Sequence, residues 1–328
     1  MLISVVILNW NGADFLRKYL PGVVKHTAMV ADSEVIVVDN HSSDDSVKLL
    51  KNEFNEVKII ELDKNYGFTG GYNRAIKRVD SKYVMLMNSD IMVNDNYLEP
   101  LIQYMEQHDD CAAVMPKILS LTEPSKFEYA GAAGGFLDFL CLPYCRGRVL
   151  SKVESDLGQY NDVCEVFWAS GAAMVVRGNL YKELGGLDDE FCMHMEEIDL
   201  CWRMKNKGYK IAYIGTSKVY HLGGGTLSYG SPRKLYYNFR NSLLMMYKNL
   251  PSKYMFIIPL RMCFDGLVAL TYLATFKYSL FKTVIEAHCD YRIALTTYKQ
   301  KRASTLRNEK LMSKSLLLIK YLQIRNKK

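Results

Sequence analysis

The stretch Lys82-Tyr-Val-Met-Leu-Met87, followed by Asn88-Ser89-Asp90, decides the fold of this chain. Its first six residues are an apolar run of strand length, and the run stops at polar residues that end in a carboxylate. In open α/β sheets, ligands bind beyond the carboxyl ends of the strands. The sequence therefore predicts that Asp90 lies at a ligand-binding edge of a buried sheet.

Three more apolar runs of strand length precede this one and end in the same way. They cover residues Leu2–Asn9, Glu34–Asp39 and Val57–Leu62. Stretches with helical character lie between them, at Phe15–Val24, Ser46–Phe54 and Tyr72–Val79. Near-continuous apolar strands that alternate with helices predict a parallel sheet covered on both faces. We therefore expect an α/β fold with a polar or glycine-rich rim along one edge of the sheet.

A second acidic cluster, Glu196-Glu-Ile-Asp199, opens a predicted helix that runs to Lys207 and stops at Gly208. Acidic residues in a first helical turn stabilise the helix by up to about 1 kcal/mol each. Helix capping alone therefore explains these acids as well as a catalytic role does. Arg203 is expected to pair with Asp199, which lies one helical turn before it.

The order of these and other motifs resembles the family 2 glycosyltransferases of the GT-A fold, above all their bacterial rhamnosyltransferase-like branch. The matching pieces are Ser4–Gly12, Val37–Asp44, Asn65–Asn73, Met87–Asp90, Ala169–Arg177, Gly185–Asp188, Glu196–Arg203 and His221. The resemblance implies a Rossmann-like nucleotide-binding half with a mostly parallel central sheet. We therefore expect a GT-A domain over residues 1–230, with a nucleotide-sugar half (1–95) and an acceptor half (96–230), and a C-terminal helical appendage over 231–328.

The resemblance also implies which residues bind the donor, a nucleotide sugar. These are Asn9, Asn11, Asp39, Asn65, Gly67, Gly70, Gly71, Asn73 and Asn88. A carboxylate suits position 39 because it accepts hydrogen bonds from a base N–H or from ribose hydroxyls, although turn chemistry explains Asp39 as well. The glycine-rich segment before Asn73 opens a helix, whose first N–H groups can approach phosphate and sugar oxygens. The first strand lacks the G-x-G-x-x-G pattern that would indicate a dehydrogenase.

A metal site is implied by the same resemblance. Asp90 corresponds to the last acid of the family's metal-binding Asp-x-Asp motif, whose first position is Asn88 here. Mg²⁺ binds through one or two carboxylates and substrate phosphates, whereas a nitrogen ligand from His221 suits Mn²⁺ better. We therefore expect a divalent cation, Mn²⁺ or Mg²⁺, with the glycine stretch Leu222–Gly225 closing over the donor. A purely structural role is the alternative for His221.

Transfer to an acceptor hydroxyl needs a base, and the family pattern implies that Glu197 is this base. Glu196 and Asp199 would then position the acceptor or a loop. The like charge of Glu196 and partial burial are expected to raise the pKa of the pair and to favour proton abstraction near neutral pH. Direct displacement implies inversion at the anomeric carbon. Trp168 is expected either to stack on an acceptor sugar or to be an ordinary core residue.

The positive charge of the chain is concentrated after residue 230. The 328 residues carry a net charge of +7, yet residues 231–328 hold 19 Lys and Arg against 4 Asp and Glu. Apolar runs at 254–260, 266–276 and 315–319 look too short or too interrupted to span a bilayer, because Arg261 and Asp265 break the first two. Basic amphipathic stretches of this kind favour an anionic membrane surface. A helical cap on the catalytic domain is the alternative.

The composition agrees with a cytoplasmic enzyme. The eight cysteines form no paired C-x-x-C repeats, so reduced thiols are expected, and the apolar N-terminus lacks the basic start of a signal peptide. We expect inverting, metal-dependent sugar transfer to a glycan or lipid-linked glycan of a cell-surface polysaccharide, at the inner face of the cell membrane and without nucleic acid. The alternatives are a basic-tailed nucleic-acid-binding protein and a non-catalytic GT-A scaffold. The sugar, the nucleotide base and the oligomeric state stay open.

Overall fold

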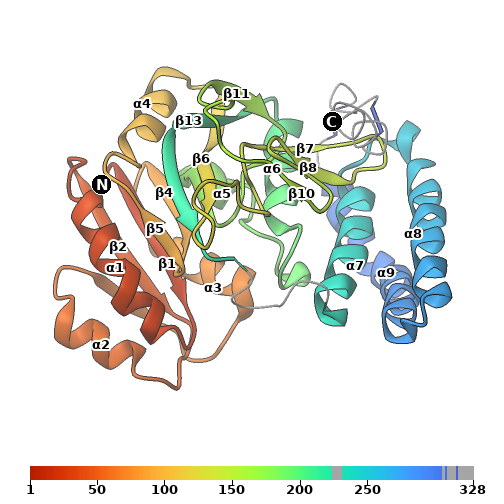
Figure 1. The fold of residues 1–328 in the computed structure, drawn as a ribbon, viewed down its shortest axis with the longest axis horizontal. Helices are drawn as coiled ribbons and strands as arrows, with labels where there is room; N and C mark the ends of the chain where they lie inside the picture. The colour runs from red at the N-terminus through yellow and green to blue at the C-terminus, as the bar shows by residue number, and fades with distance from the viewer. Residues whose placement is uncertain (224–230, 305–306, 309–314, 317–328) are drawn as a thin grey trace.

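The computed structural model describes residues 1–223, 231–304, 307–308 and 315–316. A large mixed sheet forms the centre of the molecule, and three long C-terminal helices stand at one end of it (Figure 1). The strand order is β11-β13-β6-β12-β4-β1-β2-β3, with β5 paired to β13. The expected α/β class with a central, largely parallel sheet is therefore confirmed.

The N-terminal part alternates strands and helices as the sequence predicts. Strands β1 (Ile3–Asn9), β2 (Ser33–Asp39), β3 (Lys58–Glu61) and β4 (Tyr83–Asn88) pair in parallel. Helices α1 (Ala13–Thr27), α2 (Ser46–Glu53) and α3 (Gly67–Ile76) connect them. The register places Asn9 beside Asp39, and Asn88 beside Leu8. The polar strand ends therefore meet at one edge of the sheet.

Helix α3 begins earlier than the sequence predicts. Gly67 is its first residue, so Gly70 and Gly71 are helical and not part of a loop. A side-chain carbon on Gly71 would lie 2.6 Å from Leu8 Cδ1, which is closer than two carbon atoms can approach. Glycine at this position therefore lets α3 pack directly on β1, and this packing keeps a glycine-rich segment helical.

The second half of the domain mixes strand directions. Strands β6 (Cys111–Ser120) and β13 (Lys210–His221) are parallel, whereas β12 (Ala173–Arg177) runs antiparallel between β6 and β4. Strands β5 (Ile91–Val93) and β11 (Val163–Val166) pair antiparallel with β13. Helices α4 (Glu99–Gln107), α5 (Gly178–Glu183) and α6 (Glu196–Asn206) pack on this half. A small sheet holds β7 (Gly135–Leu137), β8 (Pro143–Cys145), β9 (Arg148–Val149) and β10 (Lys152–Val153).

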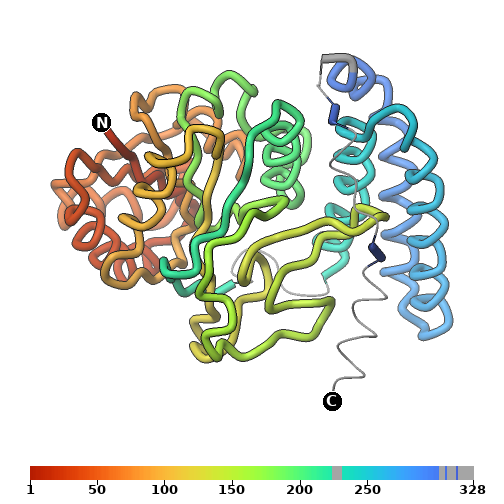
Figure 2. Tube along the Cα trace, turned by 90° about the horizontal axis from the view of Figure 1, so that it is seen from above, coloured from red at the N-terminus to blue at the C-terminus, as the bar shows by residue number. Residues whose placement is uncertain are grey.

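The C-terminal helices are α7 (Pro232–Asn249), α8 (Ile257–Ala274) and α9 (Tyr278–Ser304). Figures 1 and 2 show them side by side at the end of the molecule away from the N-terminal strands. Four consecutive residues of α7, Leu243–Met246, are fully buried in the same apolar core as the central sheet. Helix α7 therefore belongs to the core of the catalytic domain, although it follows the predicted boundary at residue 230.

Helix α8 corrects the expectation that no run in this segment has the length of a membrane span. Residues Ser252–Ala274 form a helical segment of 23 residues, and an 18-residue window within it has a mean hydropathy of 1.6; by length and composition the segment could cross a bilayer. Arg261 and Asp265, which interrupt the run in the sequence, pair with each other at 2.8 Å inside the protein. The outer surface of the helix stays apolar because both charges face inward. The other predicted run, at 315–319, lies largely outside the described residues.

Candidate active site

The ends of β1 and β2 form a hydrogen-bonded rim. Asn9 Nδ2 donates to Asp39 Oδ1 (3.2 Å) and to Ser42 Oγ (3.3 Å), and Asp39 Oδ2 accepts from the backbone N–H of Ser42 (2.9 Å). Asn9 Oδ1 is buried and has no hydrogen-bond partner within the described part of the chain. An unpaired buried acceptor costs about 1–3 kcal/mol, so this oxygen favours a ligand N–H or hydroxyl. Asn11 lies exposed beside the rim, and its amide oxygen accepts from the Ser43 N–H (2.7 Å).

Asn40 joins this rim to the start of α3. Its Nδ2 donates to Asn65 Oδ1 and to the Gly67 carbonyl, both at 3.0 Å, and its Oδ1 accepts from the Tyr66 N–H (2.9 Å). These bonds bring two predicted donor-binding residues, Asn65 and Gly67, to the end of β2. The sequence indicated only turn chemistry for Asn40, and its position directly after Asp39 was the one available signal for a larger role.

Asn73 is turned toward the interior of the protein. Its Nδ2 donates to the Leu187 carbonyl and to Asp189 Oδ1, both at 2.7 Å. Its Oδ1 accepts from Tyr181 Oη (2.7 Å) and from the Leu187 N–H (2.9 Å). Protein groups thus fill the hydrogen-bonding positions of this amide. Asn73 connects α3 to the loop before α6. If Asn73 contributes to donor binding, it does so through this connection and not by direct contact with the donor.

Asp90 and His221 come together at the ends of β4 and β13. Asp90 Oδ1 lies 3.2 Å from His221 Nε2, and Asn88 Nδ2 lies 3.3 Å from the same nitrogen. Burial disfavours the charged imidazole, but the nearby carboxylates of Asp90 and Glu128 outweigh it and raise the pKa of His221 to about 10. Burial also disfavours the Asp90 carboxylate, yet the contact with His221 lowers the pKa of Asp90 below its usual value.

The geometry of this pair fits two ligands of one cation. Ligand bonds of about 2.1 Å at a right angle place two ligand atoms about 3 Å apart, close to the observed 3.2 Å. Glu128 Oε1 lies 3.7 Å from His221 Nδ1, and a carboxylate on the second nitrogen commonly orients a metal-binding histidine. No group of three or more His, Cys, Asp and Glu suited to a metal occurs among the described residues. A cation here therefore needs further oxygen ligands, such as a donor diphosphate.

Glu128 is a site residue that the sequence did not indicate. It is 4% exposed, and it lies in a segment without regular secondary structure, where no local pattern marks it as functional. Its place beside His221 follows from the pairing of β13 with β6. The glycine stretch that follows His221, predicted to close over the donor, lies partly outside the described residues because it includes positions 224 and 225.

The acid pair of α6 lies at the same edge of the sheet. The Asn88 N–H donates to the Ala172 carbonyl at 3.0 Å, which places the turn before β12 at the end of β4. A side-chain carbon on Gly171 in this turn would lie 3.6 Å from Glu197 Cβ and 3.7 Å from Phe68 Cζ of α3. The structure thus brings Glu197 to the strand ends that carry the predicted donor-binding residues.

Glu196 and Glu197 have the properties of carboxyls poised to exchange a proton. Glu196 is buried and Glu197 partly buried, and the Oε2 atom of each has no hydrogen-bond partner among the residues that the structure describes. Burial raises the pKa of Glu197 to about 7. Burial and the charge of Glu197 together raise the pKa of Glu196 well above its usual value. A carboxyl with a pKa near neutrality suits a general base.

A strained loop precedes this acid pair. Three of the residues in Cys192–Met195 have positive φ values between 62° and 74°, a region that residues other than glycine seldom occupy. Asn241 of α7 donates through Nδ2 to three backbone oxygens of this loop and the residue before it, at 2.8 to 3.0 Å. Helix α7 therefore holds the backbone that positions the start of α6.

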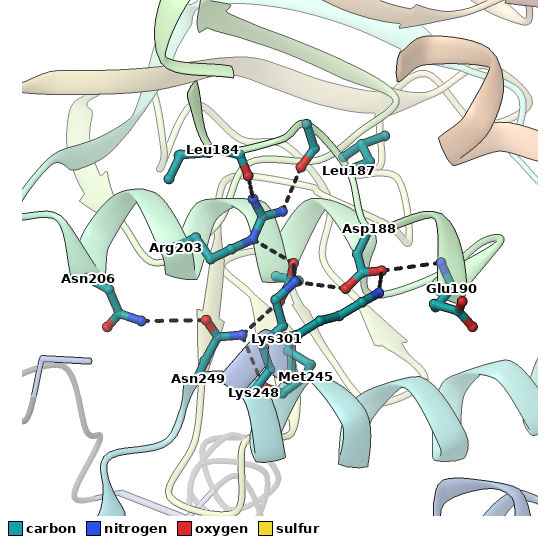
Figure 3. Close-up of polar contacts among 12 residues, drawn as sticks. Leu184, Leu187, Asp188, Glu190, Arg203, Asn206, Met245, Lys248, Asn249 and Lys301 are labelled. Atoms are coloured by element: carbon teal, nitrogen blue, oxygen red, sulfur yellow. Dashed lines mark hydrogen bonds and ion pairs between the residues drawn. The ribbon is translucent and has the colours of Figure 1, made fainter. Parts of the chain in front are cut away.

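Asp199 is part of a polar network that joins α6 to α7 and α9 (Figure 3). The Asp199 carboxylate is 0% exposed and accepts from Arg203 Nε (2.8 Å), Lys248 Nζ (2.9 Å) and Asn249 Nδ2 (2.7 Å). The predicted pair of Arg203 with Asp199 is therefore present. Because the Asp199 carboxylate accepts hydrogen bonds from three protein donors and is not exposed to solvent, it fits a positioning role better than direct contact with an acceptor.

Asp188 forms the other half of this network. Its carboxylate accepts from Lys248 Nζ (2.8 Å) and from Lys301 of α9. Burial disfavours its charged form, but the two ammonium groups outweigh this and lower the pKa of Asp188 to about 2. Lys248 thus bridges two buried carboxylates, one on α6 and one on the loop before it. No sequence pattern indicated this bridge, because Lys248 lies in the segment predicted to be an appendage.

Trp168 is packed inside the protein. It is 3% exposed, and its Nε1 donates to the Phe136 carbonyl at 3.1 Å. A side chain on Gly135 would overlap the indole ring. Of the two interpretations that the sequence left open, these contacts favour the core residue over a stacking platform for an acceptor sugar.

Comparison with known proteins agrees with this arrangement. The family model of glycosyl transferase family 2 matches residues 4–135. The chain is 24% identical over 232 residues to rhamnosyltransferase WbbL of Escherichia coli, covering 67% of this chain and 83% of that protein. It is 20% identical over 234 residues to the N-acetylglucosaminyl-diphospho-decaprenol L-rhamnosyltransferase of Mycobacterium tuberculosis, covering 67% and 76%.

The fold is similar to that of solved glycosyltransferase structures. GalNAc-T7, crystallised with UDP, GalNAc and Mn²⁺, superposes with a TM-score of 0.61 at 15% identity, over 90% of this chain and 57% of that chain. This likeness concerns the fold alone, and it confirms the GT-A architecture with additional C-terminal helices. The family-model match and these named relatives support a family 2 glycosyltransferase of the rhamnosyltransferase-like branch, a sugar-transferring enzyme.

Proposed function

We propose that the protein transfers a sugar, with inversion, from a nucleotide-sugar donor to a hydroxyl of a glycan or lipid-linked glycan in cell-surface polysaccharide synthesis. The observation that carries this proposal is the position of Glu197 at the sheet edge where the predicted donor-binding residues meet. Its carboxylate is partly buried, and one of its oxygens has no hydrogen-bond partner among the described residues. The name of the mycobacterial relative supports a lipid-linked acceptor. The presence of UDP and Mn²⁺ in the GalNAc-T7 structure supports a nucleotide-sugar donor and a divalent cation.

The donor is proposed to bind along the rim of strand ends. Asn9 Oδ1 and the Asp39 carboxylate accept from the base or ribose, because both lie buried beside an open strand end. The start of α3, positioned by Asn40, supplies backbone N–H groups to the phosphates or the sugar. Asp90 and His221 hold a divalent cation, Mn²⁺ or Mg²⁺, and Glu128 orients the imidazole. Such a cation, when bound, offsets the negative charge of the departing diphosphate.

The acceptor hydroxyl is proposed to lose its proton to Glu197. As its oxygen forms a bond to the anomeric carbon, the bond from that carbon to the diphosphate oxygen breaks and the electron pair leaves with the nucleotide. Attack opposite the leaving group inverts the anomeric centre. Glu196 lies beside this base, and burial together with the charge of Glu197 raises the pKa of Glu196 well above its usual value.

The test compares Glu197→Gln with Glu196→Gln. A panel of UDP-, GDP- and dTDP-linked sugars, screened by thermal shift with and without Mn²⁺, first identifies the donor. Glu197→Gln keeps the shape of the side chain and removes the base, so turnover is expected to fall about 10²-fold or more, with donor binding unchanged. An active Glu197→Gln variant beside an inactive Glu196→Gln variant would reverse the two roles.

We also propose that the protein works at the inner face of the cell membrane, attached to its anionic surface. The net charge of +15 over residues 231–328 supports this location. Each basic residue near an anionic surface contributes about 1 kcal/mol, and salt weakens the attraction. Co-sedimentation with anionic vesicles at low and high salt tests it. If no binding occurs at low salt, the C-terminal helices serve only as a cap on the catalytic domain.

A further inference from the structure

Helix α8 turns apolar side chains outward. Six exposed residues on α8 and beside its two ends, called here the apolar stripe, lie three, four or seven positions apart, and this spacing places the four leucines among them on one side of the helix. They are Phe256, Leu260, Leu267, Leu270, Leu273 and Phe276, with exposed fractions between 38% and 77%. A solvent-facing helix side normally carries polar and charged residues, so this side of α8 has the composition of a covered surface.

The opposite side of α8 is fixed to the protein by charged groups. Arg261 and Asp265 pair at 2.8 Å and are 3% and 0% exposed. Arg261 Nη1 also donates to the Leu140 carbonyl at 3.2 Å, and His288 Nε2 of α9 lies 3.5 Å from Asp265 Oδ2. The helix therefore has its charges inside and its leucines outside, an inversion that lipid stabilises and water does not.

These contacts decide how α8 can meet a membrane. Its first residues, Ile257 and Ile258, are buried in the core that also contains the central sheet. While they and the bond from Arg261 to Leu140 persist, α8 stays packed along the protein and cannot cross a bilayer as a separate span. Only the apolar stripe is available to lipid, which corresponds to a helix that lies in the plane of the membrane interface.

Exposed cationic side chains lie at both ends of the apolar stripe. Lys253 and Lys277 lie exposed near the two ends of α8, and Arg292 lies exposed on the adjacent α9. Two copies of the chain joined through this face would bring these like charges together, whereas anionic lipid headgroups would neutralise them. The charge pattern therefore favours a lipid surface over a second copy of the chain.

We propose that the apolar stripe inserts into the boundary between headgroups and acyl chains of an anionic bilayer, with α8 parallel to the membrane plane. This inference deepens the membrane location proposed above and rests on that proposal. It predicts that apolar contact contributes to binding in addition to the basic charge of the segment. Vesicle binding requires no catalysis, so its failure is distinguishable from a failure of the proposed transfer reaction.

The test uses the full chain with vesicles of phosphatidylcholine alone and of phosphatidylcholine mixed with phosphatidylglycerol. The double variant Leu267→Gln/Leu270→Gln removes apolar surface from the centre of the stripe without touching a buried residue, and its partition to anionic vesicles is expected to fall about tenfold or more. Leu157→Gln, at a catalytic-domain loop residue that is 86% exposed, is the matched control and should bind as the parent does. In a separate variant, Leu267→Trp should show a blue-shifted emission with anionic vesicles.

Each outcome decides the proposal in one direction. Equal vesicle binding by the parent and the double variant overturns it, as does unshifted emission of Leu267→Trp on bound protein. Sedimentation equilibrium in vesicle-free buffer tests for a dimer. If the parent is a dimer and the double variant is not, while the variant still binds vesicles, the stripe is an interface between copies, and this result also overturns the proposal. Lost vesicle binding with an unchanged melting temperature and an unchanged donor thermal shift supports it.

Discussion

Replacing Lys248 by methionine tests whether the C-terminal helices hold the catalytic acid pair in place. The Lys248 ammonium lies 2.8 Å from Asp188 Oδ2 and 2.9 Å from Asp199 Oδ2, and all three side chains are at most 6% exposed. Methionine has a similar length but no charge, so both carboxylates lose a buried cation. Loss of one partner from a buried ion pair costs about 3–5 kcal/mol.

The remaining cations set the expected size of the effect. Arg203 still pairs with Asp199, and Lys301 still pairs with Asp188. We therefore expect Lys248→Met to lower the free energy of unfolding by about 3–5 kcal/mol at pH 7, not by twice that amount. The pKa of Asp188 is lowered in the folded protein, so its stabilisation is present above its usual value of 3.8 and is lost as the pH falls toward about 2. The difference between parent and variant should accordingly shrink below about pH 4.

Urea denaturation at pH 7 and at pH 3 measures this difference. The matched control is Lys282→Met, which removes an exposed pair with Glu286 (3.4 Å) on α9 and should cost about 0.3–0.5 kcal/mol. Because Lys248 bridges α6 to the loop before it, kcat should fall while the KM for the donor changes little. A Lys248→Met variant that loses less than about 1 kcal/mol and keeps the parent kcat would refute this reasoning.

The remaining predictions concern the metal, the acid pair and one close helix contact. Asp90→Ala should abolish the increase in donor affinity that Mn²⁺ produces in a titration, and an unchanged increase would contradict the metal assignment. Because the pKa of Glu197 is raised from 4.5 to about 7, kcat should rise with pH through about 7, and the stability linked to the protonated form should be lost as the pH rises from 4.5 to about 7. Glu197→Gln should therefore unfold at higher urea than the parent at pH 8 but not at pH 5, and equal shifts at both values would count against the raised pKa. Gly71→Ala should destabilise by about 1–3 kcal/mol because its side chain would collide with Leu8, whereas Gly22→Ala, with no atom within 4 Å, should be neutral or stabilising in the same melting experiment.

Local pattern was sufficient for the first four strands, β1 to β4, and for the edge of the sheet that they build. The polar stops at Asn9, Asp39 and Asn88 are the last residues of β1, β2 and β4, because an apolar run and its polar end are adjacent in the chain. The start of α3 was placed too late. Glycines in sequence indicate a loop, and only contact with Leu8 of β1 explains why Gly71 is needed within a helix.

Partners that lie far apart in the chain could not be found this way. Asn241 binds the loop before α6 from 50 residues away, and Lys248 reaches Asp188 across 60 residues. Glu128 meets His221 only because β6 and β13 are neighbours in the sheet. No periodicity in the sequence encodes these contacts, since each depends on how separate elements pack.

The same limit applies to α8, where composition and packing give different answers. The sequence by itself determined that an apolar segment with two charges follows the catalytic domain, and the charges argued against a segment that spans a bilayer. Only the tertiary structure decided which way each side chain faces. Arg261 and Asp265 pair with each other inside the protein, near His288 of α9, and this leaves Leu267 and Leu270 outside. The free energy of a charge depends on its surroundings, and those surroundings are set by packing between elements and not by position in the chain.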